Sequence, residues 1–225
     1  MTSVTRTADG PTLRDVVRDA SFLAGAPRRF LMEIALTPVG LGVAEHSRAL
    51  RDPVGRFRNT TAYIYLVAFG TPTEREAVIR RVNRAHGPVR SGPDAPVAYS
   101  AFDPALQLWV AGCMYYGGRD PWQRGFGPMG PDAAGRPYEQ VQTYGTSLQV
   151  PAELWPADRA AYDAYLARTL DGIDLDPRVR EYGHRLLDPA SHPLPVRPVL
   201  RLVRFVTVGL LPDRLRDAYG FPWSP

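Results

Sequence analysis

The chain has 225 residues, and its apolar fraction of 44% is sufficient for one domain with one substantial core. All 27 basic residues are arginines, and they are scattered among 23 acidic residues, so the formal net charge is only +4. No run of basic residues interleaved with aromatic ones occurs, which argues against a nucleic-acid-binding protein. The single cysteine, Cys113, excludes an internal disulfide and a cysteine metal cluster.

The amino terminus and the apolar segments bear on where the protein resides. Residues 1–10 are polar and lack the apolar core of a signal peptide, and we expect them to be disordered. A membrane-spanning helix needs about 18 or more apolar residues. The best candidate, 203–211, is short, is interrupted by Arg204 and is ended by Pro212. We therefore expect a cytoplasmic protein without a transmembrane segment.

In the first third of the chain, the positions of proline and glycine indicate where helices begin and end. One run covers residues 11–23, and a second begins at Pro27 and is interrupted at Pro38. Pro53 stands at a first-turn position, where proline is favoured because its missing N–H has no partner there. It opens a long apolar helix that we expect to end at Gly70.

Capping residues predict the next two helices. Thr73 and Glu76 have the spacing of a capping box and predict the start of a helix that ends at Gly87. Asp103 precedes a proline and predicts the N-cap of another helix, which we expect to end at the glycine pair 117–118.

A segment rich in glycine and proline follows, and we expect residues 119–135 to form a flexible loop. Alternating strand patterns are nearly absent, so the fold class predicted is all-α, a single-domain helical bundle of about eight to nine helices over residues 1–225. The remaining helices are expected at about 137–148, 157–170, 177–187 and 198–210, with a short one from 212.

The helix that begins at Pro53 carries a polar stripe. Arg56, Asn59, Thr60 and Tyr63 share one face at 3.6 residues per turn, while the other faces are largely apolar. An unpaired buried arginine costs several kcal/mol, so this stripe needs partners. A ligand or cofactor pocket supplies them; alternatively, Arg56 pairs with a carboxylate such as Glu45 and the other side chains bond internally.

His86 lies at the end of the helix predicted to follow Thr73. It continues the apolar face of Ile79 and Val82, with the spacing i, i+3 and i+7. From the pattern alone, such a histidine is either a core residue with an internal hydrogen bond or a ligand of a metal or haem.

Five short motifs occur in an order and spacing that resemble the core of the MpaB-like oxygenase family. This family includes the latex clearing proteins, b-type haem enzymes that cleave carbon–carbon double bonds with dioxygen. The resemblance resumes near the carboxyl terminus, at residues 211–220. The motifs are Val43-Ala-Glu-His-Ser47, Arg56-Phe-Arg-Asn-Thr60, Ala85-His86-Gly-Pro-Val-Arg90, Tyr99-Ser-Ala-Phe-Asp-Pro104 and Leu108-Trp-Val110.

The resemblance implies a globin-like helical core around haem b, with His86 as the proximal iron ligand. It implies that Arg90 reaches a haem propionate, as arginine binds carboxylates in a bidentate manner. His46 matches another family position and is expected to support the pocket or, as the lesser alternative, to ligate iron. Cys113 matches no family motif and is expected to be a buried, inert thiol.

The resemblance implies that the face with Arg56 and Thr60 lies on the opposite side of the haem. Together with Asn59 of the same polar stripe, these two are expected as catalytic residues. Arg56 is also expected to bind a haem propionate, and Tyr63 is expected to contact the cofactor. Two departures from the family pattern limit which family activities are expected of this chain. Asn59 stands where latex clearing proteins place a lysine, and Ala111 stands where family members commonly place a histidine. An amide does not coordinate iron as an amine does, so rubber cleavage is not expected.

The leading hypothesis is therefore a haem-dependent oxidoreductase that acts on a hydrophobic or aromatic small molecule with dioxygen or peroxide. Oxygen insertion, alkene cleavage and dehydrogenation all stay open, and a homodimer is compatible with the sequence. Tyr115, Tyr116 and Trp122 are expected to form a compact pocket closed by the loop 119–135. The alternatives are a non-catalytic haem- or lipid-like-ligand-binding protein and a metal-free acid–base enzyme.

Overall fold

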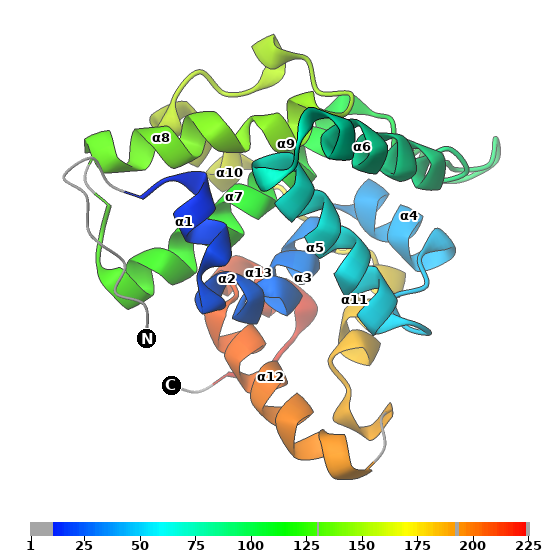
Figure 1. The fold of residues 1–225 in the computed structure, drawn as a ribbon. Helices are drawn as coiled ribbons and strands as arrows, with labels where there is room; N and C mark the ends of the chain where they lie inside the picture. The colour runs from blue at the N-terminus through cyan, green and yellow to red at the C-terminus, as the bar shows by residue number, and fades with distance from the viewer. Residues whose placement is uncertain (1–10, 130, 192–193, 224–225) are drawn as a thin grey trace.

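The structure is a computed structural model that describes residues 11–129, 131–191 and 194–223, so the expected disorder of residues 1–10 lies outside the described residues. These residues form thirteen α-helices and three short 3₁₀ turns and contain no strand (Figure 1). The helices are α1 (Leu13–Arg18), α2 (Ala20–Ala24), α3 (Ala26–Ala35), α4 (Thr37–His46), α5 (Pro53–Phe69), α6 (Pro72–His86), α7 (Pro104–Phe126), α8 (Pro131–Val141), α9 (Thr143–Thr146), α10 (Arg159–Asp171), α11 (Pro177–Leu186), α12 (Arg197–Leu210) and α13 (Asp213–Tyr219).

The predicted all-α class is confirmed, but the number of helices is larger than eight to nine, in part because the predicted runs 11–23 and 137–148 each divide into two helices. The first run breaks at Asp19, whose backbone is extended and whose carboxylate accepts a hydrogen bond from the backbone N–H of Ser21 at 2.8 Å. The run that begins at Pro27 breaks at Leu36, also extended, close to the predicted interruption, because Pro38 occupies the first turn of α4 and lacks the N–H that a continuous helix requires.

The predicted loop 119–135 is largely wrong, because α7 continues to Phe126 and α8 begins at Pro131. The glycine pair inside α7 serves packing rather than termination. A Cβ on Gly117 would lie 3.0 Å from Arg29 Cδ, and one on Gly118 would lie 2.9 Å from Val16 Cγ1. Helix α7 ends instead at Gly127, where φ is +89°, a conformation that favours glycine.

The predicted capping box at Thr73 and Glu76 is also wrong by two residues. Thr71 is the N-cap of α6: its hydroxyl accepts a hydrogen bond from Glu74 N at 3.3 Å, and Glu74 Oε2 accepts one from Thr71 N at 2.9 Å. Pro72 decides between the two registers because it takes the first helical position. The predicted cap at Asp103 is confirmed, with its carboxylate accepting from Ala105 N at 2.8 Å.

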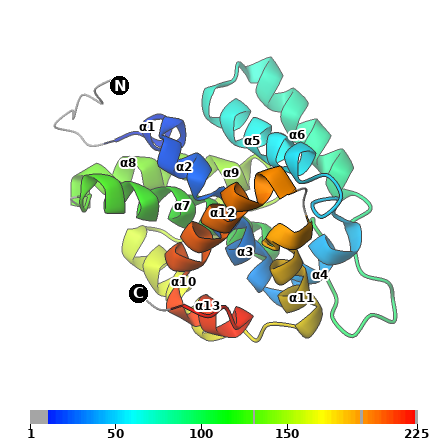
Figure 2. The same ribbon diagram turned by 90° about the horizontal axis from the view of Figure 1, so that it is seen from below.

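Helices α3 and α7 form the centre of the molecule. Trp109 on α7 is fully buried, and its indole N–H donates to the carbonyl oxygen of Glu33 on α3 at 3.0 Å. Helices α5 and α6 form a hairpin beside α4, while α8 lies near α7 (Figures 1 and 2). Within the described parts of the chain, no helix combines the length and apolar character needed to cross a bilayer.

Candidate active site

A cavity of about 510 Å³ opens between α4, the α5–α6 hairpin and α7. This volume lies in the range of about 300–1,000 Å³ that is typical of cofactor and ligand sites. Its apolar walls include several valines, among them Val39, Val43, Val82 and Val110. Charged or ionisable side chains also line it, namely Glu33, His46, Arg48, Asp52, Arg56, Tyr63, Arg81, His86, Tyr99 and Tyr144.

The polar stripe of α5 faces this cavity. Arg56 and Thr60 both line it, and Arg56 Nη1 donates a hydrogen bond to Thr60 Oγ1 at 3.0 Å. The Arg56 guanidinium also lies over the ring of Phe30, 5.5 Å from its centroid. The alternative pairing of Arg56 with Glu45 is wrong, because the Glu45 carboxylate accepts instead from the Tyr99 hydroxyl at 2.5 Å.

Asn59 and Tyr63, the other two members of the stripe, line the cavity at different depths. Asn59 is exposed, and its Oδ1 accepts a hydrogen bond from Arg81 Nη2 on α6. Tyr63 is buried, and its hydroxyl donates to the carbonyl oxygen of Tyr144 at 2.6 Å. Burial raises the pKa of Tyr63, so this phenol stays neutral and its proton is committed to the protein.

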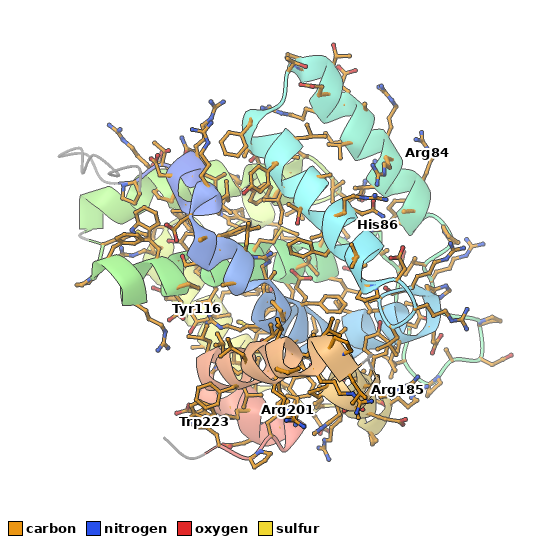
Figure 3. All side chains as sticks on the ribbon, turned by 60° about the horizontal axis from the view of Figure 1, so that its bottom comes forward. Arg84, His86, Tyr116, Arg185, Arg201 and Trp223 are labelled. Carbon is orange, nitrogen blue, oxygen red and sulfur yellow. The ribbon has the colours of Figure 1, made fainter. Side chains whose placement is uncertain are left out.

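His86 is the last residue of α6, and its imidazole faces the cavity, whereas Arg84 on the same turn points into solvent (Figure 3). Its Nδ1 is buried and has no hydrogen-bond partner among the described residues. Burial, and then the positive charge of Arg56, lower the pKa of His86 to about 4. The ring is therefore neutral near pH 7, the form in which imidazole binds metals.

Of the other two residues predicted from the sequence, His46 lies at the cavity and Arg90 does not. His46 lines the mouth of the cavity, with its Nε2 3.2 Å from the Tyr99 hydroxyl. Arg90 is exposed and is not among the cavity-lining residues; its backbone forms an isolated bridge with Ser100. The structure therefore does not bring the guanidinium of Arg90 to the site, and Arg48 and Arg81 supply cationic side chains there instead.

Glu33 is a cavity residue that the sequence analysis missed. It is 5% exposed, and Arg29 Nε lies 4.0 Å from its Oε1. Burial raises the pKa of the Glu33 carboxyl, while the charges of Arg29 and Arg56 oppose that shift. The available signal was a carboxylate in the otherwise apolar segment 31–35, because such a residue on a buried helix must face a partner or a polar cavity.

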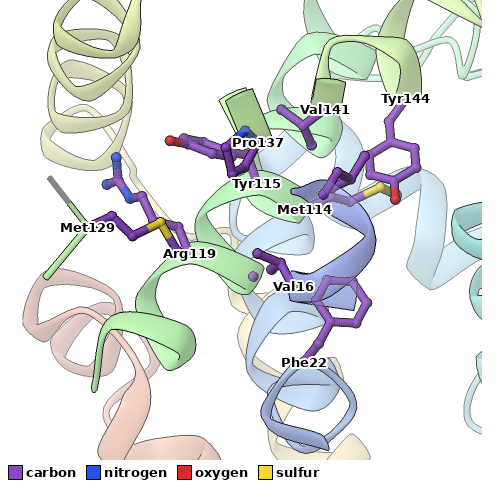
Figure 4. A pocket seen from close by; sticks show the side chains of 11 residues that line it. Val16, Phe22, Met114, Tyr115, Arg119, Met129, Pro137, Val141 and Tyr144 are labelled. Carbon is purple, nitrogen blue, oxygen red and sulfur yellow. The ribbon is translucent and has the colours of Figure 1, made fainter. Parts of the chain in front are cut away.

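The predicted pocket formed by Tyr115, Tyr116 and Trp122 is wrong, because none of them lines the large cavity. Tyr115 borders a separate apolar cavity of about 10 Å³, near Phe22 and Met129 (Figure 4). That volume is close to one water molecule and too small for a substrate. The predicted burial of Cys113 is confirmed, and burial raises the pKa of its thiol. Ala111, which stands where family members commonly place a histidine, lines the large cavity.

Among the described residues, no group of three or more His, Cys, Asp and Glu side chains gathers as a protein-only metal site would require. The site thus consists of one histidine with a free buried nitrogen, a hydrogen-bonded Arg56–Thr60 pair, a buried carboxyl and further arginines around an apolar space.

Residues 14–225 match the family described as "ER-bound oxygenase mpaB/B'/Rubber oxygenase, catalytic domain". The chain belongs to this family. Two uncharacterized mycobacterial proteins, Rv2237 of Mycobacterium tuberculosis and Mb2261 of Mycobacterium bovis, are each 37% identical over 199 residues, covering 86% of this chain and 78% of the relative. No solved structure matches the chain. Family membership confirms the resemblance predicted from the motifs and supports an oxygenase-type enzyme.

Proposed function

We propose that the protein is a haem b-dependent oxidative enzyme that acts on a hydrophobic small molecule with dioxygen or peroxide. The observation that carries the proposal is the neutral imidazole of His86 on the wall of the large cavity, where Nδ1 is enclosed by protein and Nε2 is the nitrogen that is left accessible. A neutral imidazole has a nitrogen lone pair that an iron atom in the cavity would bind.

The residues around the cavity fit a haem. A porphyrin brings four nitrogen ligands of its own, so one neutral histidine is sufficient as the protein ligand. Its two carboxylates need cationic partners, and Arg48, Arg56 and Arg81 line the cavity. The valines of α4, α6 and α7 suit the apolar faces of the macrocycle. When bound, the haem would supply the activation of dioxygen or peroxide.

The protein's own polar groups have distinct tasks in this proposal. Because the Thr60 oxygen accepts from Arg56, the Thr60 hydroxyl proton is available to a ligand in the cavity. Tyr63 shapes the wall without donating to a ligand, because its proton is bound to the Tyr144 carbonyl. Glu33, whose pKa is raised, can hold or accept a proton inside the protein.

The substrate class rests on Asn59. Polymer-cleaving relatives place a lysine at this position, whereas here a neutral amide lies at the exposed edge of the cavity and is bonded to Arg81. We therefore propose a small apolar or aromatic substrate, as in the tailoring of natural products, rather than polyisoprene.

The test is a UV–visible spectrum of protein expressed with a sufficient haem supply. We expect a Soret band with stoichiometric haem, and we expect His86→Ala to lose haem or to change the spectrum. His184→Gln is the matched control, since His184 lies outside the cavity and bonds to the Tyr219 carbonyl. Stoichiometric haem and an unchanged spectrum in His86→Ala would refute the assignment of His86 and make His46 the next candidate.

Turnover separates an enzyme from a carrier. Dioxygen or peroxide should give product from an apolar small molecule, whereas haem binding without product formation would support the non-catalytic alternative. Efficient cleavage of polyisoprene to aldehydes and ketones would contradict the small-molecule assignment.

A further inference from the structure

Helix α12 presents an apolar face to solvent. Val199, Leu202 and Phe205 recur at i, i+3 and i+6, so they share one side of the helix, and they are 62%, 62% and 61% exposed. The same kind of surface begins before the helix, with Leu194 73% and Val196 44% exposed. Figure 1 shows α12 projecting from the lower side of the molecule, away from the α5–α6 hairpin that borders the large cavity.

This orientation is the reverse of the usual one. A surface helix normally turns its apolar stripe toward the core and its charged residues toward solvent. Here the side of α12 that is buried carries Thr207 and Val208, and Thr207 Oγ1 has no hydrogen-bond partner in the described parts of the chain. Exposed apolar side chains that are grouped, rather than scattered singly, indicate an interaction surface.

The charges around this face are predominantly positive, although Asp188 lies close enough to Arg204 and Arg197 for their charges to lower its pKa. Residues 189–212 contain three arginines and no acidic residue. Arg201 is exposed and lies one turn before Phe205, at the border of the apolar face. Arg204 lies over the Phe221 ring at 5.1 Å, and Arg197 donates to the Ala190 carbonyl at 3.0 Å, so both are held beside the helix by the body of the protein.

A tryptophan completes the surface. The rings of Phe205 and Trp223 lie 5.0 Å apart, and both residues are at least partly exposed (Figure 3 labels Trp223 and Arg201). Apolar and aromatic side chains on one face, with arginines at its border, are the composition of helices that lie in the interface of a bilayer. Tryptophan is enriched at that depth because its ring is apolar and its N–H is polar.

We propose that α12 is a docking helix for the surface of an anionic phospholipid bilayer. Val199, Leu202 and Phe205 would enter the boundary between headgroups and acyl chains, and the arginines would lie at the level of the lipid phosphates. A second copy of this chain fits less well. Two α12 faces packed together would bring six arginines near one another, three from each copy, against one neighbouring aspartate, Asp188, from each copy. The inference rests on α12 alone and does not depend on the proposed oxidative activity.

The test is co-sedimentation of the full chain with vesicles. We expect the wild-type protein to bind vesicles that contain phosphatidylglycerol and phosphatidylcholine, and to bind pure phosphatidylcholine at least about fivefold more weakly. Raising the salt concentration should weaken binding to the anionic vesicles. Failure of the wild-type protein to bind anionic vesicles would overturn the proposal.

Three variants locate the binding surface. The double variant Leu202→Ser with Phe205→Ser should reduce vesicle binding about tenfold or more, because insertion depends on buried apolar area. Arg201→Glu should reduce binding to anionic vesicles about fivefold or more and leave binding to neutral vesicles little changed. Val54→Ser is the matched control, since Val54 is 74% exposed on α5 and its loss should leave binding unchanged.

Circular dichroism and thermal unfolding check that the variants fold, which is expected because the altered side chains are exposed. Equal vesicle binding by the wild-type protein and the double variant would contradict the proposal. Light scattering tests whether a second copy of the chain covers α12 instead. If the wild-type protein forms a concentration-dependent dimer that the double variant abolishes, and does not bind vesicles, α12 is an interface between copies.

Discussion

Arg56 and Thr60 lie one turn apart on α5, and the Arg56 guanidinium donates to the Thr60 hydroxyl oxygen at 3.0 Å. This bond uses an acceptor site of the hydroxyl and leaves its proton free. Because both side chains line the large cavity, the pair can present one oriented O–H donor to whatever the cavity holds.

Replacement of Thr60 should therefore separate activity from folding. Thr60→Val removes the donor at nearly constant volume, and we expect turnover to fall about 10- to 100-fold. The free energy of unfolding should fall by only about 1 kcal/mol. Thr60→Ser keeps the hydroxyl and should keep turnover within about threefold of wild type. Turnover by Thr60→Val at the wild-type rate would rule out a catalytic hydroxyl.

The stability of the apoprotein should depend on pH through His86. Its pKa in the folded state is about 4, below its ordinary value of 6.5, because burial and Arg56 disfavour the imidazolium. Below pH 6.5 the unfolded chain therefore binds a proton that the folded chain does not, so stability present at pH 7 is lost as the pH falls toward 4.

We expect a loss of about 2–3 kcal/mol across this window from His86. Urea unfolding at pH 7 and at pH 4.5, compared between wild type and His86→Asn, measures it. The variant should show a smaller decrease, and an identical decrease in both proteins would mean that His86 does not cause it.

The cationic partners of a bound haem should be those that line the cavity. Arg48→Gln and Arg81→Gln should each raise the haem dissociation constant about five- to tenfold, a modest effect because both side chains are exposed. Arg90→Gln is the matched control and should change the constant by less than about twofold. A larger effect of Arg90→Gln in a haem titration would restore the role implied by the family motif.

Glu33 should stabilise the fold through its buried counterion. In Glu33→Gln the buried Arg29 guanidinium loses its carboxylate partner, so we expect a loss of about 3 kcal/mol in urea unfolding. Glu45→Gln, in which an exposed carboxylate is replaced, should cost less than about 1 kcal/mol. Equal stability of Glu33→Gln and wild type would indicate that the Glu33 carboxyl is already protonated in the fold.

The glycines of α7 give a packing test within one helix. Gly118→Ala places a Cβ 2.9 Å from Val16 Cγ1 and should destabilise the protein by about 1–3 kcal/mol. Gly125→Ala meets nothing within 4 Å and should be neutral or stabilising by up to about 1 kcal/mol. Thermal unfolding of the two variants measures the difference, and equal melting temperatures would contradict this account of Gly118.

The features that could be predicted from the sequence depend on short-range rules. Pro53 and Asp103 mark helix starts because their effect is local, and the Arg56–Thr60 stripe follows from the helical period. The termination predicted at 117–118 failed for the opposite reason: glycine ends a helix in some settings and permits close packing in others, and only Arg29 and Val16, distant in sequence, decide between them.

The residues of the site also differ in whether local sequence rules could find them. His86 and Arg56 were found because each lies within a recognisable motif. The cavity also receives Glu33 from α3, Arg48 from the segment after α4 and Arg81 from the second half of α6. These elements are not related by helical spacing, so the sequence pattern does not bring the three residues together. Arg90, although part of a motif, was placed wrongly because the loop after α6 turns back to pair with Ser100.

The hairpin of α5 and α6 has a consequence for how this architecture can diversify. The candidate iron ligand and the candidate hydrogen-bond donors all belong to one uninterrupted stretch, residues 53–86, whereas much of the remaining cavity wall comes from α4 and α7. Mutations in those two helices can therefore change the size and shape of the chamber without displacing the reactive groups. Selection for a new substrate can thus change residues of α4 and α7 while the reactive residues of α5 and α6 stay unchanged.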